Sequence, residues 1–357
     1  MKNKKEKLKK ENKKELSNNN NNNNRNIQLD LFKAFAILAI ILKHFGIIPS
    51  WSFVFAIPLF VFVSASLYYE GTKNIRLDKM FKSFIWIFGI IGIITLLFKY
   101  FKFSKFFFED LNGLILPQIA SYINRNPYLG NLWYFLLYFQ ILIVIFLLNK
   151  NKPINLKKYY FGILVFIISI TSAYIIYFLL PEGYISPIVL SWLFIIYLGY
   201  YYYEPIRDYF NKKNVLLLIV HILASLLMIF LIMFIGKEQL VEFLKIQTHD
   251  FLFPTFIMQF FYFVIIFSIT ELMIRYLPIL INKPFVIIGR YSLYLYLFHF
   301  YLYKLSYKLI SEYSLSEVNK WIIFLFVIIT GLLIGYILEI IRVFIFKEKL
   351  ILKKKNK

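Results

Sequence analysis

From about residue 30 onward, the chain alternates between long apolar runs and short connections rich in lysine and arginine. An α-helix needs roughly 20 apolar residues to cross a bilayer, and runs of this length recur along the whole chain. We therefore predict an all-α, polytopic transmembrane helical bundle of about ten spans. The predicted spans lie near residues 30–47, 52–70, 82–101, 131–149, 159–180, 186–203, 214–236, 252–274, 285–303 and 321–346.

Proline marks several of the predicted turns, because it cannot continue the hydrogen-bond ladder of the preceding helix. We expect the chain to turn at Pro49, at Pro181-Glu182-Gly183 and at Asn282-Lys283-Pro284. The two halves of the chain do not carry matching pairs of short, interrupted spans, which are typical of transporters with internal repeats.

Composition supports the membrane assignment. Of the 357 residues, 60% are hydrophobic and 17% are charged, whereas a soluble domain has about half apolar and a quarter charged residues. Cysteine is absent, which excludes disulfides, thiolate metal sites and acyl-cysteine intermediates. The four histidines, His44, His221, His249 and His299, are not at metal-ligand spacing, so we expect no metal.

The net charge of +22 is concentrated in alternate connections. With an even number of spans, 28 lysines and arginines lie on the side of the N-terminus and 8 on the opposite side. The positive-inside rule then predicts a multi-pass protein of the cytoplasmic membrane with both termini in the cytoplasm. The same distribution argues against nucleic-acid binding, which needs basic residues gathered on one folded face.

Three regions differ in composition. Residues 1–28 are rich in lysine and asparagine and predict a disordered cytoplasmic tail. No cleavable signal sequence is visible there, so we expect the first span to act as the membrane anchor. Residues 29–347 form the predicted membrane domain, and residues 348–357 form a basic cytoplasmic tail.

Ionisable residues inside a membrane are costly, which makes each one a candidate site. The first span carries Asp30, Lys33 and His44. Lys33 and His44 lie on one helical face, because eleven residues bring the chain about 20° past three full turns, and roughly 16 Å along the axis. Lys33 could hold a phosphorylated donor while His44 works on an acceptor. Alternatively, Lys33 snorkels to the interface and sets topology, and His44 is a polar residue near the opposite interface.

Four segments resemble the acyltransferase 3 family of membrane acyltransferases. The first is Leu29-Asp30-Leu31-Phe32-Lys33 followed by His44, which matches the family's Arg/Lys-x10-His pattern. The others are residues 57–66 (IPLFVFVSAS), 131–136 (NLWYFL) and 288–299 (IGRYSLYLYLFH). The resemblance extends from about residue 27 to 345 and preserves the order and spacing of the segments.

The resemblance implies transfer of an acyl group, usually acetyl, from cytoplasmic acetyl-CoA to a hydroxyl of a cell-surface polysaccharide or of its lipid-linked glycan precursor. The site residues that it implies are His44 as the catalytic residue, Lys33, Lys79 and Lys82 for the donor, and Asp30, Ser64, Trp133 and His299 in supporting roles. The sequence departs from the family pattern at Ala65, Asn131 and the pair Lys79 and Lys82, where glycine, histidine and arginines are usual. Lysine keeps the charge but loses bidentate contact with phosphate.

The chemistry of this transfer suits histidine. An alcohol that attacks a thioester needs a base whose pKa is near neutral. Without cysteine or a G-x-S-x-G motif, direct transfer or a transient acyl-histidine is more economical than an acyl-serine. His299 lies about 14 residues, or roughly 21 Å, into its predicted span, at a height similar to His44. It is either a substrate ligand or second acid/base in a shared pocket, or it bonds to a neighbouring helix.

Two other functions remain as alternatives to the acyltransferase. A helical bundle with a charged interior could transport a sugar or a lipid-linked glycan, although the missing repeat and the Lys33–His44 spacing disfavour it. A non-catalytic membrane scaffold is the second alternative, suggested by the departures at Ala65 and Asn131.

Overall fold

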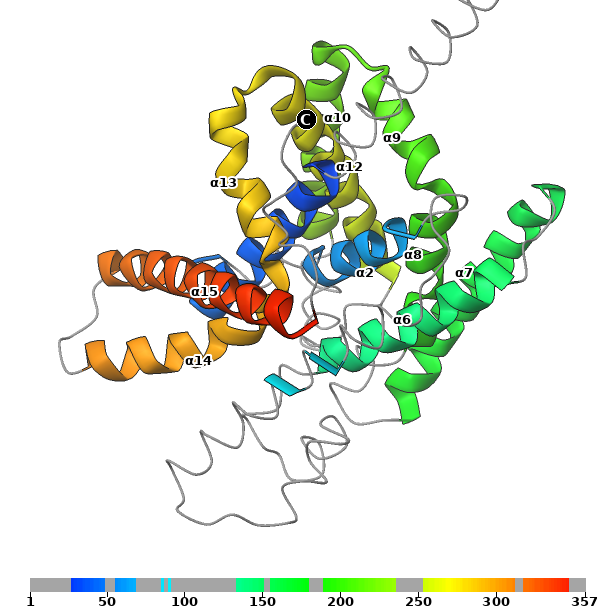
Figure 1. The fold of residues 1–357 in the computed structure, drawn as a ribbon. Coiled ribbons are helices and arrows are strands. Elements are labelled where there is room, and N and C mark those ends of the chain that lie inside the picture. The colour runs from blue at the N-terminus through cyan, green and yellow to red at the C-terminus, as the bar shows by residue number, and fades with distance from the viewer. Residues whose placement is uncertain are drawn as a thin grey trace, which may run out of the picture.

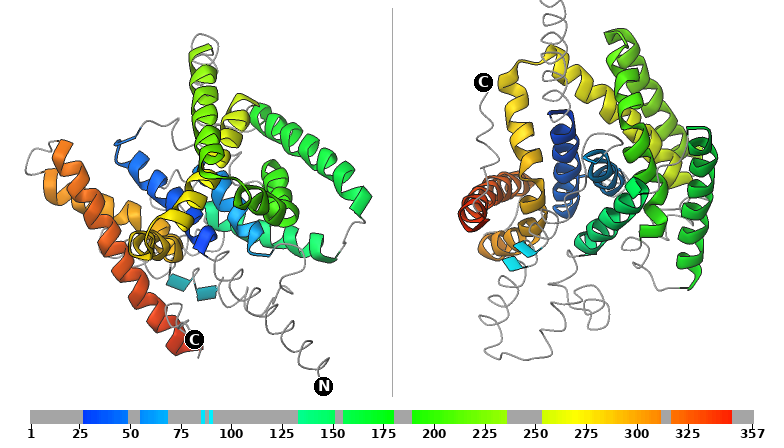
Figure 2. Two further views of the ribbon diagram at one scale, coloured as in Figure 1. Left: turned by 90° about the horizontal axis from the view of Figure 1, so that it is seen from above. Right: turned by 45° about the vertical axis from the view of Figure 1, so that its right-hand side comes forward.

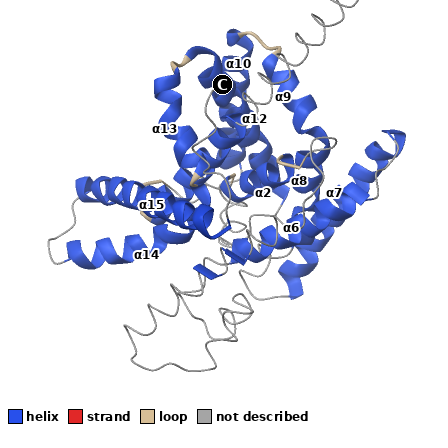
Figure 3. Cartoon of the chain, viewed as in Figure 1, coloured by secondary structure: helices blue, strands red, loops and turns tan. Residues whose placement is uncertain are grey.

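The computed structural model describes residues 27–48, 55–68, 85–86, 89–90, 133–150, 155–179, 189–235, 253–311 and 317–346. Within these ranges every regular element is a helix and no strand occurs (Figure 3), so the prediction of an all-α protein is confirmed. The N-terminal tail to residue 26, most of the predicted span 82–101, and both Lys79 and Lys82 lie outside the described residues.

The described helices follow one another in chain order. The first helix covers residues 27–44. It is followed by α2 (Ala56–Ser66), α6 (Trp133–Lys150), α7 (Asn155–Leu179), η3 (Val189–Trp192), α8 (Leu193–Tyr197), the π-helical η4 (Leu198–Tyr202), α9 (Tyr203–Asn211), α10 (Val215–Ile235), α12 (Phe253–Tyr276), α13 (Ile279–Arg290), α14 (Ser292–Ser311) and α15 (Glu317–Phe346).

Three of the described helices are long and apolar enough to cross a membrane. The crossing segments are Val215–Ile232 in α10, Ile257–Tyr276 in α12 and Lys320–Phe346 in α15. Shorter apolar segments lie in α2, α6 and α7. The membrane character of the chain therefore rests on these helices, while the count of ten spans and the cytoplasmic position of both termini stay predictions.

The first helix, blue in Figure 1, lies at the centre of the described chain. Figure 2 shows it and α2 between α13, α14 and α15 on one side and the helices from α6 to α12 on the other. Its apolar residues are buried almost all round, with Leu31, Phe32, Ala36 and Ile37 at 0% exposure. A helix that is hydrophobic on every face belongs in a core, so any charged side chain on it needs a partner.

The first helix ends in a glycine cap. Gly46 has φ +65°, and its N–H bonds to the carbonyl of Lys43 while the N–H of Ile47 bonds to that of Leu42. This is the Schellman arrangement, which needs a left-handed residue and therefore favours glycine. The helix thus ends before Pro49, and His44 is its last helical residue.

The turn that we predicted at Asn282-Lys283-Pro284 is wrong. The chain turns instead at Leu277 and Pro278, and Pro284 lies inside α13. The side chain of Asn282 is buried and donates to the carbonyls of Met273 and Leu277 at 2.8 and 3.4 Å. Because this amide satisfies the last carbonyls of α12, the reversal has to precede Asn282.

The stretch predicted as one span over residues 285–303 is divided between two helices in the structure. α13 ends at Arg290 and α14 begins at Ser292, with Tyr291 between them at φ −98° and ψ 9°. The sequence gives no proline or glycine signal directly at this residue. The break coincides with a contact between Arg290 and the first helix, which is described below.

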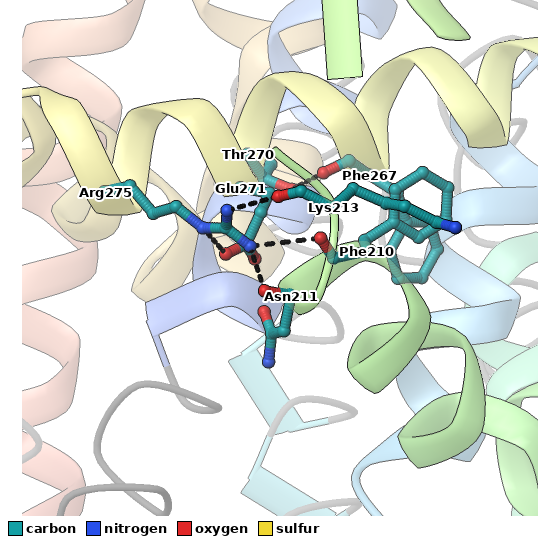
Figure 4. A network of polar contacts seen from close by, with 7 residues as sticks. All are labelled: Phe210, Asn211, Lys213, Phe267, Thr270, Glu271 and Arg275. Atoms are coloured by element: carbon teal, nitrogen blue, oxygen red, sulfur yellow. Dashed lines mark hydrogen bonds and ion pairs between the residues drawn. The ribbon is translucent and has the colours of Figure 1, made fainter. Parts of the chain in front are cut away.

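Arg275, near the end of α12, stabilises the turn between α9 and α10 (Figure 4). Its guanidinium lies 2.5 Å from Glu271 and donates to the backbone carbonyls of Phe210, Asn211 and Lys213. These carbonyls lie at or just after the C-terminus of α9, where a cation also compensates the helix dipole. Arg275, which the charge count placed in a cytoplasmic connection, therefore joins two helix ends.

Candidate functional site

The first helix presents polar side chains at both of its ends. Asp30 and Lys33 lie in its first two turns, and His44 is in its last turn. Both ends contact the α13–α14 segment, through Arg290 at the first end and through His299 at the second. One central helix therefore joins two polar clusters that lie roughly 16 Å apart along its axis.

At the first end, Asp30 is shared between two cations. Its Oδ1 lies 2.6 Å from Nζ of Lys33, and its Oδ2 lies 3.3 Å from Nε of Arg290. The Asp30 side chain is 12% exposed, whereas Lys33 is 21% and Arg290 is 33% exposed. The buried carboxylate is thus compensated on both oxygens, as a buried charge must be, and the triad keeps an excess of one positive charge.

Gly289 allows Arg290 to reach this position. A Cβ at residue 289 would overlap the backbone carbonyl of Asp30. Only glycine lets two backbones approach this closely. The end of α13 therefore lies directly on the first helix, which places the next residue, Arg290, beside the Asp30 carboxylate.

At the second end, two histidines face each other. The ring centroids of His44 and His299 are 5.2 Å apart, with their planes tilted by 36°. His44 is exposed at the surface of the described chain, whereas His299 is 1% exposed. His44 is therefore the accessible member of the pair, and His299 lies behind it in the core.

The hydrogen bond of His299 fixes its neutral tautomer. Its Nδ1 lies 2.7 Å from the carbonyl oxygen of Tyr296, one turn earlier in α14. A carbonyl only accepts, so Nδ1 carries the proton and Nε2 keeps its lone pair. Nε2 is buried and has no hydrogen-bond partner among the described residues. The pair therefore offers one accessible imidazole and one buried, oriented acceptor.

Of the other predicted site residues, only Ser64 has a described side chain. Ser64 is buried in α2 and donates to the carbonyl of Phe60, 2.7 Å away in the same helix. Trp133 is the first residue of α6, and its side chain lies outside the described part, as do Lys79 and Lys82. Three of the eight predicted residues therefore lie at the first helix itself, and His299 joins them from α14.

Ala65, one of the departures from the family pattern, has a structural explanation. It is fully buried in α2 and faces Gly199 of η4, where an added Cβ would come within 2.9 Å of the Ala65 Cβ. The methyl group of Ala65 fits because the opposing residue has none. The departure is therefore accommodated in the packing of α2 against η4.

Sequence reasoning missed charged residues within apolar runs, among them Arg290, Glu339 and Arg342. Glu339 is fully buried in α15, pairs with Arg342 at 3.0 Å and accepts from the hydroxyl of Tyr294 at 3.2 Å. The rule that intramembrane ionisable residues are candidate sites applies to all three and would have found them.

The packing of α14 against α15 also had a sequence signal. Gly331 and Gly335 form a small-residue motif, and Cβ atoms there would come within 2.6 Å of Leu295 and 3.0 Å of Tyr294. This close packing fixes α14, and with it His299, against the longest described helix.

Metal ligands do not gather in the described part of the chain, where no group of three or more histidine or acidic side chains lies at binding distance. The two clusters instead provide cations at one end and imidazoles at the other. Such a pair of sites can bind an anionic group and transfer a proton.

The chain is similar to a known protein family over most of its length. A family model described as an acyltransferase domain matches residues 26–340. The match includes both clusters and nearly all of the described helices. No curated protein and no solved structure matches the chain.

Proposed function

The chain belongs to the acyltransferase 3 family, and from this premise we propose that it transfers an acetyl group from cytoplasmic acetyl-CoA to a hydroxyl of a cell-surface polysaccharide or its lipid-linked glycan precursor. Acyl transfer follows from the family. Acetyl as the group, coenzyme A as the carrier and a glycan as the acceptor are our proposal, and so is the cytoplasmic membrane as the location.

One observation carries the proposal: a single central helix joins a cationic cluster at one end to a histidine pair at the other. A CoA thioester is a long molecule with phosphates at one end and the reactive carbonyl at the other. Phosphates bind cations through charge-assisted hydrogen bonds. Lys33 would hold this end, so that the thioester could extend along the first helix toward His44.

The histidine pair suits proton transfer between the acceptor and the leaving group. His44 would take the proton of the acceptor hydroxyl as its oxygen attacks the thioester carbonyl. When the carbon–sulfur bond breaks, the thiolate leaves and receives that proton from His44. The products are an ester and free CoA, and His44 returns to its starting state.

We assign His299 to positioning the acceptor or His44 rather than to the main proton transfer. It is almost fully buried, and its Nδ1 is committed to Tyr296. Its Nε2 can accept one hydrogen bond, from the acceptor hydroxyl or from the ring of His44. Either bond would hold the reacting groups in place, which is a large part of catalysis in an oriented site.

The test compares a deletion strain with strains that express the wild-type protein or His44→Gln at equal level. We expect cell-surface glycans to lose O-acetyl groups in the deletion strain, to regain them with the wild type, and not to regain them with His44→Gln. Membrane vesicles with labelled acetyl-CoA should show label in the glycan. Sugar or glycan uptake without transfer would favour a transporter, and unchanged glycan acylation in the deletion strain would contradict the proposal.

A further inference from the structure

We propose that Arg290 is a further donor-binding residue, which together with Lys33 forms a two-cation site for the diphosphate of the CoA ester. This inference rests on the proposed function. It goes beyond it by adding a residue that the resemblance did not assign, and by naming the part of the donor that the residue binds.

Lys33 and Arg290 lie close together in the structure. Lys33 comes from the first helix and Arg290 from the end of α13, and both contact the same carboxylate, that of Asp30. Two cations held by the two oxygens of one carboxylate are necessarily near neighbours. The negative charge of Asp30 thus holds the two cations together in spite of their mutual repulsion.

Both cations keep N–H groups beyond those that contact Asp30. Within the Arg290 guanidinium, Nε is the one nitrogen that contacts another described residue, namely Asp30. The two terminal amino groups of Arg290 are therefore available. Nζ of Lys33 carries further N–H groups beyond the one directed at Asp30. Both side chains are partly exposed, whereas Asp30 is largely buried. The cluster therefore has N–H donors and a net positive charge available for an anion.

Arginine and lysine bind phosphate with different geometry. The planar guanidinium of arginine makes two parallel hydrogen bonds to a phosphate, which lysine cannot. Lys33 can therefore make single contacts with a phosphate but not a bidentate one. Arg290 supplies such a contact from another part of the chain.

The backbone contact at Gly289 fixes the position of Arg290 beside the first helix. The carbonyl of Asp30 lies against the Cα of Gly289, so Arg290 cannot move away without separating α13 from the first helix. A ligand-binding side chain on packed helices is held more firmly than one on a loop. The site is therefore built before the donor arrives.

The experiment uses the full-length protein in membrane vesicles and two donors that differ only in the phosphate-bearing part. These are acetyl-CoA and S-acetyl-pantetheine, which carries the same thioester without phosphates. Wild type, Arg290→Gln and Arg290→Lys are compared by kcat/KM for each donor and by equilibrium binding of CoA. Arg207→Gln is the control, since Arg207 is also ion-paired, but with Glu204 and Asp208 on α9 and not with Asp30.

We expect Arg290→Gln to lower kcat/KM for acetyl-CoA, and CoA affinity, by roughly 10- to 100-fold. Arg290→Lys should lose less, and Arg207→Gln should lose nothing. All variants should use S-acetyl-pantetheine as well as the wild type does. Should Arg290→Gln fail to fold, Arg290→Lys, which keeps the ion pair with Asp30, still tests the loss of the bidentate contact.

Three other outcomes would overturn the proposal. Equal losses with both donors would make Arg290 a structural residue that only positions the first helix. Unchanged use of acetyl-CoA by Arg290→Gln would remove it from the donor site while leaving the proposed function intact. If the wild type neither binds CoA nor uses acetyl-CoA, the proposed function itself fails, and the role of Arg290 with it.

Discussion

His44 occupies the last turn of its helix, and this position affects its chemistry. The carbonyls that end a helix carry partial negative charge, which stabilises a nearby cation. An imidazole that has accepted a proton is such a cation, so the helix dipole contributes in favour of the charge that develops during proton transfer. The glycine cap at Gly46 turns the chain away immediately afterwards, which leaves the ring exposed to an acceptor.

Replacing His44 should abolish transfer, because general base catalysis is typically worth about 10²–10⁴-fold in rate. His44→Gln keeps size and hydrogen bonding, and His44→Ala does not, yet we expect both to lose activity to a similar extent. His221→Gln is the control, since His221 bonds only to the Leu217 carbonyl and the Tyr209 hydroxyl among the described contacts. The measurement is the rate of labelled acetyl transfer, normalised to protein level.

The same assay separates the two histidines. His299→Gln should reduce transfer less than His44→Gln, because a positioning bond is lost while the base remains. Normal transfer by a well-expressed His44→Gln protein, with none by His299→Gln, would reverse the two roles and make the buried imidazole the base.

Lys33 should contribute to donor binding through its charge. Lys33→Ala removes one of the two cations on Asp30 and should raise the KM for acetyl-CoA about tenfold, with a smaller change in kcat. Lys33→Arg keeps the charge and should retain most of the affinity. A normal KM in Lys33→Ala would leave Lys33 with a role in topology only, and reporter fusions would then show whether that role exists.

At the scale of helices, the hydrophobic pattern predicts most of the described elements. The segments 133–150, 215–235, 253–276 and 317–346 each fall close to a predicted span, because long apolar runs have no stable place outside a helix in a membrane. Helix ends that depend on tertiary contacts are less predictable from the sequence. The break at Tyr291 accompanies the pairing of Arg290 with Asp30, two residues that are far apart in the sequence.

In the candidate site, too, the sequence predicts one part of the geometry and does not predict another. The spacing of Lys33 and His44 follows from one helix, and the sequence contains it in full. The pairing of His44 with His299 and of Asp30 with Arg290 depends on how α13 and α14 pack, which a helical period does not encode. The Asn282 side chain and the close approach at Gly289 determine that packing, and both are recognised only when the neighbouring helix is in place.

Gly289 provides a test of this packing. Gly289→Ala improves intrinsic helix propensity, but its methyl group would overlap the Asp30 carbonyl, and overpacking typically costs about 1–3 kcal/mol. We expect a lower melting temperature in detergent and a weaker donor affinity. Gly89→Ala is the matched control, because a Cβ there meets nothing within 4 Å. Equal melting temperatures for the two variants would contradict the close contact between α13 and the first helix.

For the whole molecule, the roles of the two clusters depend on how the first helix is oriented in the membrane. The first helix holds a cation-rich end and a histidine end. Acyl-CoA is made in the cytoplasm, so the cationic end has to face inward for the proposed donor site to operate. The charge asymmetry of 28 against 8 predicts this direction independently of any contact in the structure.

Reporter fusions test the orientation directly. With ten spans and a cytoplasmic N-terminus, fusions placed after residues 76, 154, 210 and 357 should report the cytoplasm. Fusions placed after residues 115, 243 and 314 should report the outside. The physical reason is that short connections rich in lysine and arginine stay on the cytoplasmic side.

The two ways in which this prediction can fail have different consequences. Reversal at one interior fusion would break the count of ten spans, yet it would leave the first helix and both clusters as they are. Reversal of every fusion would place Asp30, Lys33 and Arg290 outside the cell, away from any acyl-CoA. The donor site would then be untenable, and the histidine end would face the cytoplasm, where a cell-surface glycan could not reach it.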